Sequence, residues 1–229
     1  MPEGISNHSH RRRNFARKAI RQVDKNAPRS QTLVMRLPVV CLIATALLSL
    51  PSRAQVPVFK VTPIQGSIRC NTRSSSPIDG NFGKWSATLT FTSRDAETGA
   101  LDVEIQAASV QTGNKTKDDA LKSKDFLNSG KDPVISFKTT SSVQTSKTTF
   151  DLAGTLTFRG VSKPATLSIV IADQGFGVGY VQGTMSFNRK DYGMTGNNSL
   201  KIADSIEIDL NFKADQISGP KLAYKQFRY

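Results

Sequence analysis

TLTFRGVSKPATLSI, residues 155–169, decides the fold, because apolar and polar residues alternate on both sides of a short turn. Leu156 and Phe158 share one face of a first predicted strand, and the apolar residues of 165–169 share one face of a second. The turn between them, residues 159–164, includes a glycine that tolerates a positive φ and a proline that resists regular pairing. The alternating apolar residues either pack together as an ordinary core or line a cavity that holds a ligand.

The same alternation recurs along most of the chain after residue 58. One face of each segment is apolar and the other is polar and rich in threonine, which is typical of an antiparallel sheet with one face in water. The further predicted strands cover residues 63–72, 84–91, 101–107, 133–139, 142–147, 180–187 and 206–213. This pattern predicts a single all-β domain of about eight strands, and periodicity alone leaves a packed sandwich and a closed barrel equally open.

One segment, residues 116–127 (TKDDALKSKDFL), breaks the alternation. Thr116 followed by Asp119 resembles a capping box, and acidic residues favour a helix N-terminus. Leu121 and Phe126 would give such a helix an apolar underside. We therefore expect one short helix between strands, placed as a lid or plug.

Residues 1–54 are predicted to be a leader. The apolar, uncharged run of residues 37–50 follows a basic start and precedes Ala54, as in a secretory signal peptide cleaved after that alanine. The run is shorter than the ~20 apolar residues of a membrane-spanning helix, although an uncleaved N-terminal anchor is the alternative. Met35 is the expected initiator, so that the residues before it are an over-called start. We expect residues 55–229 to be periplasmic or secreted.

Composition then excludes several classes of function. Ten of the 31 basic and two of the 18 acidic residues lie in the leader, which leaves a net charge of +5 for the mature chain and predicts no nucleic-acid partner. Both histidines, His8 and His10, also lie in the leader, so the mature chain has no Ser-His or Cys-His pair and no histidine metal site. Cys70 alone remains of the two cysteines, and we expect it to be a small buried apolar residue. No catalytic residue, metal or cofactor is predicted.

Several short segments occur in an order that is more specific than any one of them. They are GNF (80–82), DDAL (118–121) with KDF (124–126), PVISF (133–137), GTLTFRGVSKP (154–164), FNRKDYG (187–193) and the alternating strand 206–212. In this order they resemble the YceI-like family of exported lipid- or polyisoprenoid-binding proteins, over roughly residues 58–216. The resemblance implies a single antiparallel, lipocalin-like extended barrel with a long apolar chain in its lumen.

In such a barrel the inward-facing residues are the candidate ligand contacts. They are Trp85, Leu89, Phe91, Val103, Ile105, Phe137, Leu156, Phe158, Leu167, Met185, Phe187, Ile208, Leu210 and Phe212. For each of them alone, plain core packing is an equal alternative. Arg189 is predicted either to hold a phosphate or carboxylate at the barrel mouth or to form a structural pair with Asp191, and the structural pair is favoured.

We therefore expect a binding protein and not an enzyme. Its ligand would be an isoprenoid-like or other long-chain amphiphilic lipid, such as a polyprenyl chain, a quinone or a fatty-acid derivative. The protein would carry, scavenge or store this lipid and touch a membrane surface transiently. The alternative is a packed β-sandwich that serves as an envelope interaction or stress module without a lumen ligand.

Overall fold

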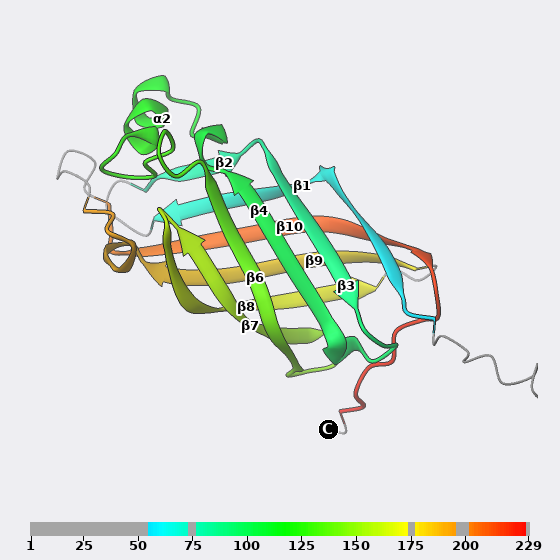
Figure 1. Ribbon diagram of the computed structural model, residues 1–229. Coiled ribbons are helices and arrows are strands. Elements are labelled where there is room, and N and C mark those ends of the chain that lie inside the picture. Colours follow the sequence, from blue (N-terminus) through cyan, green and yellow to red (C-terminus); the bar gives the residue numbers. More distant parts are fainter. Residues whose placement is uncertain (1–54, 73–76, 174–176, 196–201, 228–229) are drawn as a thin grey trace, which may run out of the picture. The chain divides into compact units, whose positions relative to one another are not determined.

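The structure, a computed structural model, describes residues 55–72, 77–173, 177–195 and 202–227. Ten strands form one antiparallel sheet in the order β3-β4-β6-β7-β8-β9-β10-β1-β2-β5 (Figure 1). The predicted leader, with its signal peptide and its start at Met35, lies outside the described residues. Within the described ranges, no helix is both long and apolar enough to cross a membrane.

The sequence prediction of an all-β antiparallel domain with one short α-helix is confirmed. The strands are β1 (Val58–Thr72), β2 (Asp79–Phe82), β3 (Trp85–Phe91), β4 (Gly99–Gln106), β5 (Val110–Gln111), β6 (Val134–Gln144), β7 (Thr149–Phe158), β8 (Val161–Asp173), β9 (Val178–Asn188) and β10 (Ser205–Ser218). The helix is α2 (Lys115–Lys122), and short 3-10 helices occur at Ala96–Thr98, Ala107–Ser109 and Arg189–Tyr192. The strand count exceeds the prediction because β2 and β5 are too short to show alternation.

The sheet curls into a lipocalin-like barrel in which the edge strand β3 approaches β1 through side chains. In the part of the chain that the structure describes, β3 forms a backbone ladder with β4 alone. It nevertheless meets β1, because the rings of Phe59 and Phe91 lie 5.4 Å apart between centroids. A Cβ on Gly66 would lie 2.9 Å from the indole of Trp85, so that only glycine fits there. The β1–β3 seam, as we call these contacts, therefore closes the barrel without a ladder.

The opening stretch forms the β7–β8 hairpin, but its turn is shorter than predicted. Arg159 (φ 52°) and Gly160 (φ 72°) alone make the turn, and two successive positive φ values match the twist of a two-residue hairpin. Pro164 lies in β8 opposite Thr155 and not in the turn. Since ladder bonds alternate along an antiparallel pair, position 164 directs its backbone nitrogen away from β7. Among the described residues, β8 has no ladder partner on that side before Ser168, so the missing N–H breaks none of the described ladders.

Helix α2 lies at one end of the barrel, beside β2 (Figure 1). It begins one residue earlier than predicted, because the side chain of Asn114, and not Thr116, accepts a hydrogen bond from the Lys117 amide at 3.1 Å. Leu121 is buried beneath it, as predicted. Phe126 is also buried, but it lies in the loop after the helix.

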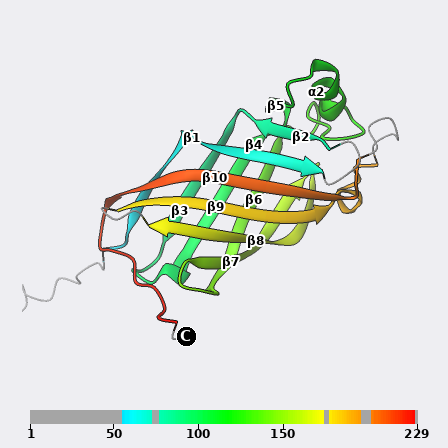
Figure 2. The ribbon, with the colours of Figure 1, turned by 180° about the vertical axis from the view of Figure 1, so that it is seen from behind.

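The opposite end of the barrel is covered by the C-terminal segment, residues 219–227. The carbonyl of Ala223 accepts a hydrogen bond from the Ala96 amide at 2.9 Å, and the ring of Tyr224 packs on Phe150 at 6.1 Å. Lys225 forms an ion pair with Glu97 at 2.6 Å. These contacts dock the end of the described chain across the strand ends (Figure 2).

Candidate ligand-binding cavity

An apolar cavity of about 70 Å³ lies inside the barrel at the α2 end. Ten of the predicted inward-facing residues line it: Val103, Ile105, Phe137, Leu156, Phe158, Leu167, Met185, Phe187, Ile208 and Leu210. Their walls present almost only carbon to the lumen, so the opening stretch of sequence lines a cavity. The polar oxygen of Thr72 is already used, because it accepts a hydrogen bond from the Ile78 amide at 2.9 Å.

About half of the lining residues are not among the predicted ligand contacts. The residues missed are Ile68, Cys70, Thr72, Ile78, Phe82, Leu121, Leu127, Ile135, Met194, Ile202 and Ile206. Some share the alternation of predicted contacts, since Ile135 lies two residues before Phe137 and Ile206 two residues before Ile208. Others, such as Leu127 and Met194, lie in loops, where no periodicity marks an inward side chain.

Four predicted contacts lie elsewhere in the barrel. Leu89 and Phe91 line a second cavity of about 130 Å³ at the end covered by the C-terminal segment. Trp85 and Phe212 pack on one another, with ring centroids 6.3 Å apart, and neither lines either cavity. Alternation therefore predicted which face of each strand points inward. It did not predict the level of each residue along the barrel axis, and so did not show which residues line a cavity and which pack between the two cavities.

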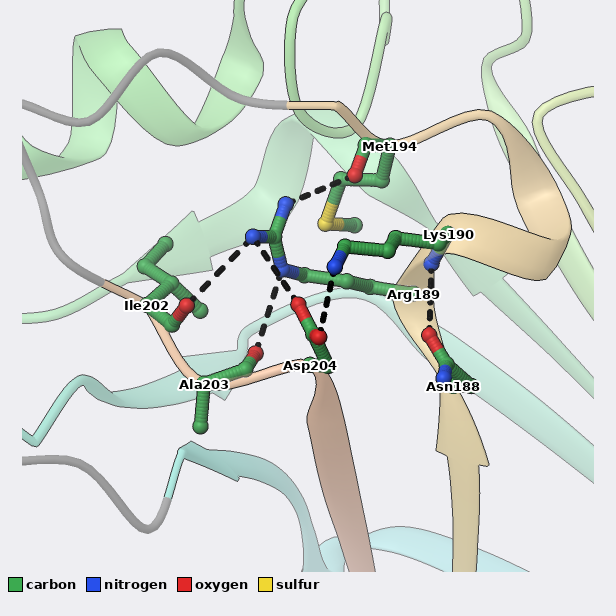
Figure 3. Close-up of polar contacts among 7 residues, drawn as sticks. All are labelled: Asn188, Arg189, Lys190, Met194, Ile202, Ala203 and Asp204. Carbon is green, nitrogen blue, oxygen red and sulfur yellow. Dashed lines mark hydrogen bonds and ion pairs between the residues drawn. The ribbon is translucent and has the colours of Figure 1, made fainter.

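Arg189 is buried, with 8% of its surface exposed, and its guanidinium points at the chain itself (Figure 3). It donates to the carbonyls of Met194 at 2.7 Å, Ala203 at 3.1 Å and Ile202 at 3.4 Å. Its carboxylate partner is Asp204 at 3.3 Å. The predicted pair with Asp191 is therefore wrong.

This arrangement gives Arg189 a structural task at the cavity. Met194 and Ile202 both line the cavity, and the guanidinium fixes their carbonyls. Arg189 itself is not among the lining residues. Lys190 also binds Asp204, at 2.7 Å, and this hydrogen bond, together with the charges of Lys190 and Arg189, holds the pKa of that carboxyl below its usual value.

Cys70 is the titratable residue of the lining. Burial raises the pKa of its thiol to about 11, so that the thiol stays protonated at neutral pH. A Cβ on Gly80 would lie 2.9 Å from the Cys70 sulfur, which shows how closely β2 covers it. The thiol therefore behaves as the expected small apolar residue.

The backbone ladder between β8 and β9 ends before the two strands do. Their ladder stops at the Ser168–Thr184 pair, although β8 begins at Val161 and β9 continues to Asn188. Leu167 and Met185, the residues next beyond this pair, line the cavity. Three aromatic rings fill the wall beyond them, with centroids 5.2–5.7 Å apart: Phe158, Phe187 and Tyr192. We call this unpaired stretch the β8–β9 opening.

A family model described as the YceI-like domain matches residues 59–214, more than half of the chain. The chain belongs to the YceI-like family. A UPF0312 protein of Pseudomonas savastanoi pv. phaseolicola is 30% identical to this YceI-like chain over 145 residues, which are 61% of this chain and 74% of the relative. Protein YceI of Escherichia coli O17:K52:H18 is 36% identical over 96 residues, 42% of this chain and 50% of the relative.

Solved structures share the fold of this YceI-like chain. BcnA of Burkholderia cenocepacia matches with a TM-score of 0.62 at 21% identity, over 67% of this chain and 99% of that chain. A Campylobacter jejuni YCEI protein matches with a TM-score of 0.55 at 29% identity, over 63% and 88% of the two chains. A polyisoprenoid binding domain from Saccharophagus degradans matches with a TM-score of 0.55 at 12% identity, over 71% and 99%. The predicted lipocalin-like barrel of the YceI-like family is thus confirmed.

Proposed function

We propose that this YceI-like chain is an exported binding protein that holds a long-chain, isoprenoid-like amphiphilic lipid in the cavity at the α2 end. It would carry, scavenge or store this lipid and touch a membrane surface transiently. The observation that carries the proposal is the carbon wall of the lumen, formed by strands from all around the barrel together with α2. The fold is shared with the S. degradans domain, which is described as polyisoprenoid binding.

Burial of apolar surface supplies the affinity in this proposal. Each CH₂ group that leaves water for such a wall gains ~0.8 kcal/mol, so a prenyl or acyl chain needs few polar contacts to bind. Water gains little in the same space, because a buried water needs two to four polar partners. The lumen is narrow, so a long chain must move lining side chains apart. Met185 and Met194 suit this role, since methionine is unbranched and adapts to irregular shapes.

Export and the absence of catalysis are parts of the same proposal. The leader pattern of residues 1–54 supports export, and it predicts that protein recovered from the cell envelope begins at or near Gln55. In the described part of the chain, no group of three or more histidine, cysteine or acidic residues is arranged to hold a metal ion.

Organic extraction of the purified protein, followed by mass spectrometry, tests the proposal. We expect a lipid with a long apolar chain in stoichiometric amount, because a lumen of this kind releases its ligand slowly. The stripped protein should then bind added lipid. The bound lipid should slow the reaction of Cys70 with an apolar thiol reagent. A matched control carries Cys70→Ala and Thr88→Cys, which moves the thiol to an exposed position on β3. Equal lipid protection of both thiols, or no binding at all, contradicts the proposal and favours the packed interaction module.

A further inference from the structure

Lys163 lies on the inner face of β8, where a lysine is unexpected. Along this strand the residues at 161, 163, 165, 167 and 169 are more buried than their even-numbered neighbours, so the odd positions face inward. Lys163 pairs with Leu156 of β7, and directly opposed residues of an antiparallel pair share a face. Because Leu156 lines the cavity, the lysine stem begins beside the cavity wall.

Among the residues that the structure describes, none is a partner of the Lys163 ammonium. Within the described ranges, neither an ion pair nor a hydrogen bond engages it. Arg189, the buried cation near the same end, is by contrast fully occupied by three carbonyls and Asp204. Lys163 is half-buried as a residue, and an anion that binds there would give its ammonium the charged acceptor that it lacks.

The β8–β9 opening makes this ammonium reachable. At the unpaired end of β8 the inward residues Val161, Lys163 and Ala165 are half-buried, whereas Leu167, where the opening begins, is buried. A polar groove of about 370 Å³ lies outside the barrel along this edge, and Met185 lines both the groove and the cavity. Met185 therefore borders both the lumen and the groove outside the barrel.

We propose that Lys163 binds the anionic head group, a phosphate or carboxylate, of an amphiphile whose chain occupies the cavity. This inference rests on the proposed function and adds to it the class of ligand. The head group would sit at the β8–β9 opening, and the chain would pass Leu156 and Leu167 into the lumen. Lysine supplies a compact charge with three donors, which suits a head group that keeps some of its water.

Pairs of ligands that differ only in the head group test the proposal. Lipid-stripped protein is titrated calorimetrically with farnesyl phosphate and farnesol, and separately with dodecanoate and dodecanol. In Lys163→Met we expect the dissociation constant of the anionic ligand to rise at least tenfold, about 1.4 kcal/mol, while that of the matched alcohol stays within about twofold. Lys163→Arg should retain most of the affinity for the anion. The phosphate and carboxylate arms show which anion the site prefers.

Lys138→Met is the matched control, because Lys138 lies on the exposed face of β6 and its loss changes the net charge equally. It should leave all four affinities unchanged. The assignment is overturned if Lys163→Met weakens the binding of the anion and of the matched alcohol equally, or if Lys138→Met weakens anion binding as much as Lys163→Met does. Either result leaves the proposed function standing. Failure of all four ligands to bind the unsubstituted protein overturns the proposed function, and the assignment with it.

Discussion

Single residues decide whether this barrel keeps an apolar lumen, and Arg189 shows how. Its guanidinium brings the carbonyls of Met194, Ile202 and Ala203 to one point, although these residues lie on separate stretches of chain. Loss of the donors would take this partner from one buried and two half-buried carbonyls and would release two lining residues. Arg189 therefore acts on the ligand through the shape of the cavity.

We expect Arg189→Met to lower the free energy of unfolding by about 1–3 kcal/mol, because hydrogen bonds from a buried charged donor are lost. Urea denaturation measures the change. Arg69→Met is the matched control, since it removes the Arg69–Asp79 ion pair, whose side chains are about half exposed, and should have little effect. Similar effects of the two substitutions would contradict a structural role for Arg189.

Cys70 allows a prediction of pH dependence. Its thiol pKa is raised to about 11, and only the thiolate reacts, so its alkylation should be slow at pH 8. The rate should rise about tenfold per pH unit up to pH 10, because each unit below the pKa reduces the thiolate fraction tenfold. Mass spectrometry of protein treated with iodoacetamide follows the reaction. The alkylation rate of the exposed thiol in the Cys70→Ala, Thr88→Cys variant should level off near pH 9. A similar plateau for Cys70 would mean that its thiol is open to solvent.

The residue scale also shows what could be predicted from the sequence. The inward side of each long strand followed from alternation, because one face of a half-buried strand must be apolar. The partners of Arg189 could not be predicted, since its carbonyl acceptors carry no side-chain signature. Lys163 was also missed, because a charged residue at an inward position looks like a break in the pattern and not like a site.

At the scale of elements, the β8–β9 opening is the feature that departs most from a regular barrel. Ser162 and Thr166 direct their amides toward β9, as the alternation of ladder bonds requires, but no ladder reaches them. Val170 directs its amide to the same side and lies within the ladder, opposite Gln182. The first half of β8 therefore differs from the second half in that no hydrogen-bond ladder joins it to β9.

Hydrogen exchange followed by NMR should reveal this difference. We expect the amides of Ser162 and Thr166 to exchange at least a hundredfold faster than that of Val170, since exchange without a ladder requires no opening of the sheet. The amide of Ala165, which faces β7, serves as an internal control and should be protected. Comparable protection at Thr166 and Val170 would mean that the opening is closed in solution.

The limits of sequence prediction at this scale have physical causes. β2 and β5 were not predicted, because strands of four and two residues are too short to show a period and are defined by the strands with which they pair. Pro164 was misplaced in the turn because proline is usually excluded from paired strands. Its position next to the β8–β9 opening explains why β8 tolerates it.

At the scale of the whole barrel, each end is closed by a different device. Helix α2 and its loop contribute to the wall of the first cavity through Leu121 and Leu127. The C-terminal segment covers the second cavity, where Leu222 and Tyr224 join the lining. The single domain, the barrel and the helix follow from patterns in the sequence, whereas residues 219–227 show no alternation that would predict their position.

Termination of the chain after Ser218 should therefore destabilise the barrel. We expect the melting temperature to fall by about 5–10 °C, because the packing on Phe150 and the hydrogen bonds to Ala96 and Gln144 are lost together. Calorimetry of the shortened chain measures this change. Lys225→Gln, which removes only the exposed ion pair with Glu97, should melt close to the unaltered protein. An unchanged melting temperature after truncation would show that the segment is not docked.

The β1–β3 seam also makes the barrel mechanically uneven. Under a load applied across the sheet, each ladder resists through a row of backbone hydrogen bonds that must break together. At the β1–β3 seam the resistance comes from a few contacts, the Phe59–Phe91 rings and the Trp85 indole against Gly66. Under such a load we expect the barrel to separate first at the β1–β3 seam. Trp85, the single tryptophan of the chain, lies at this seam.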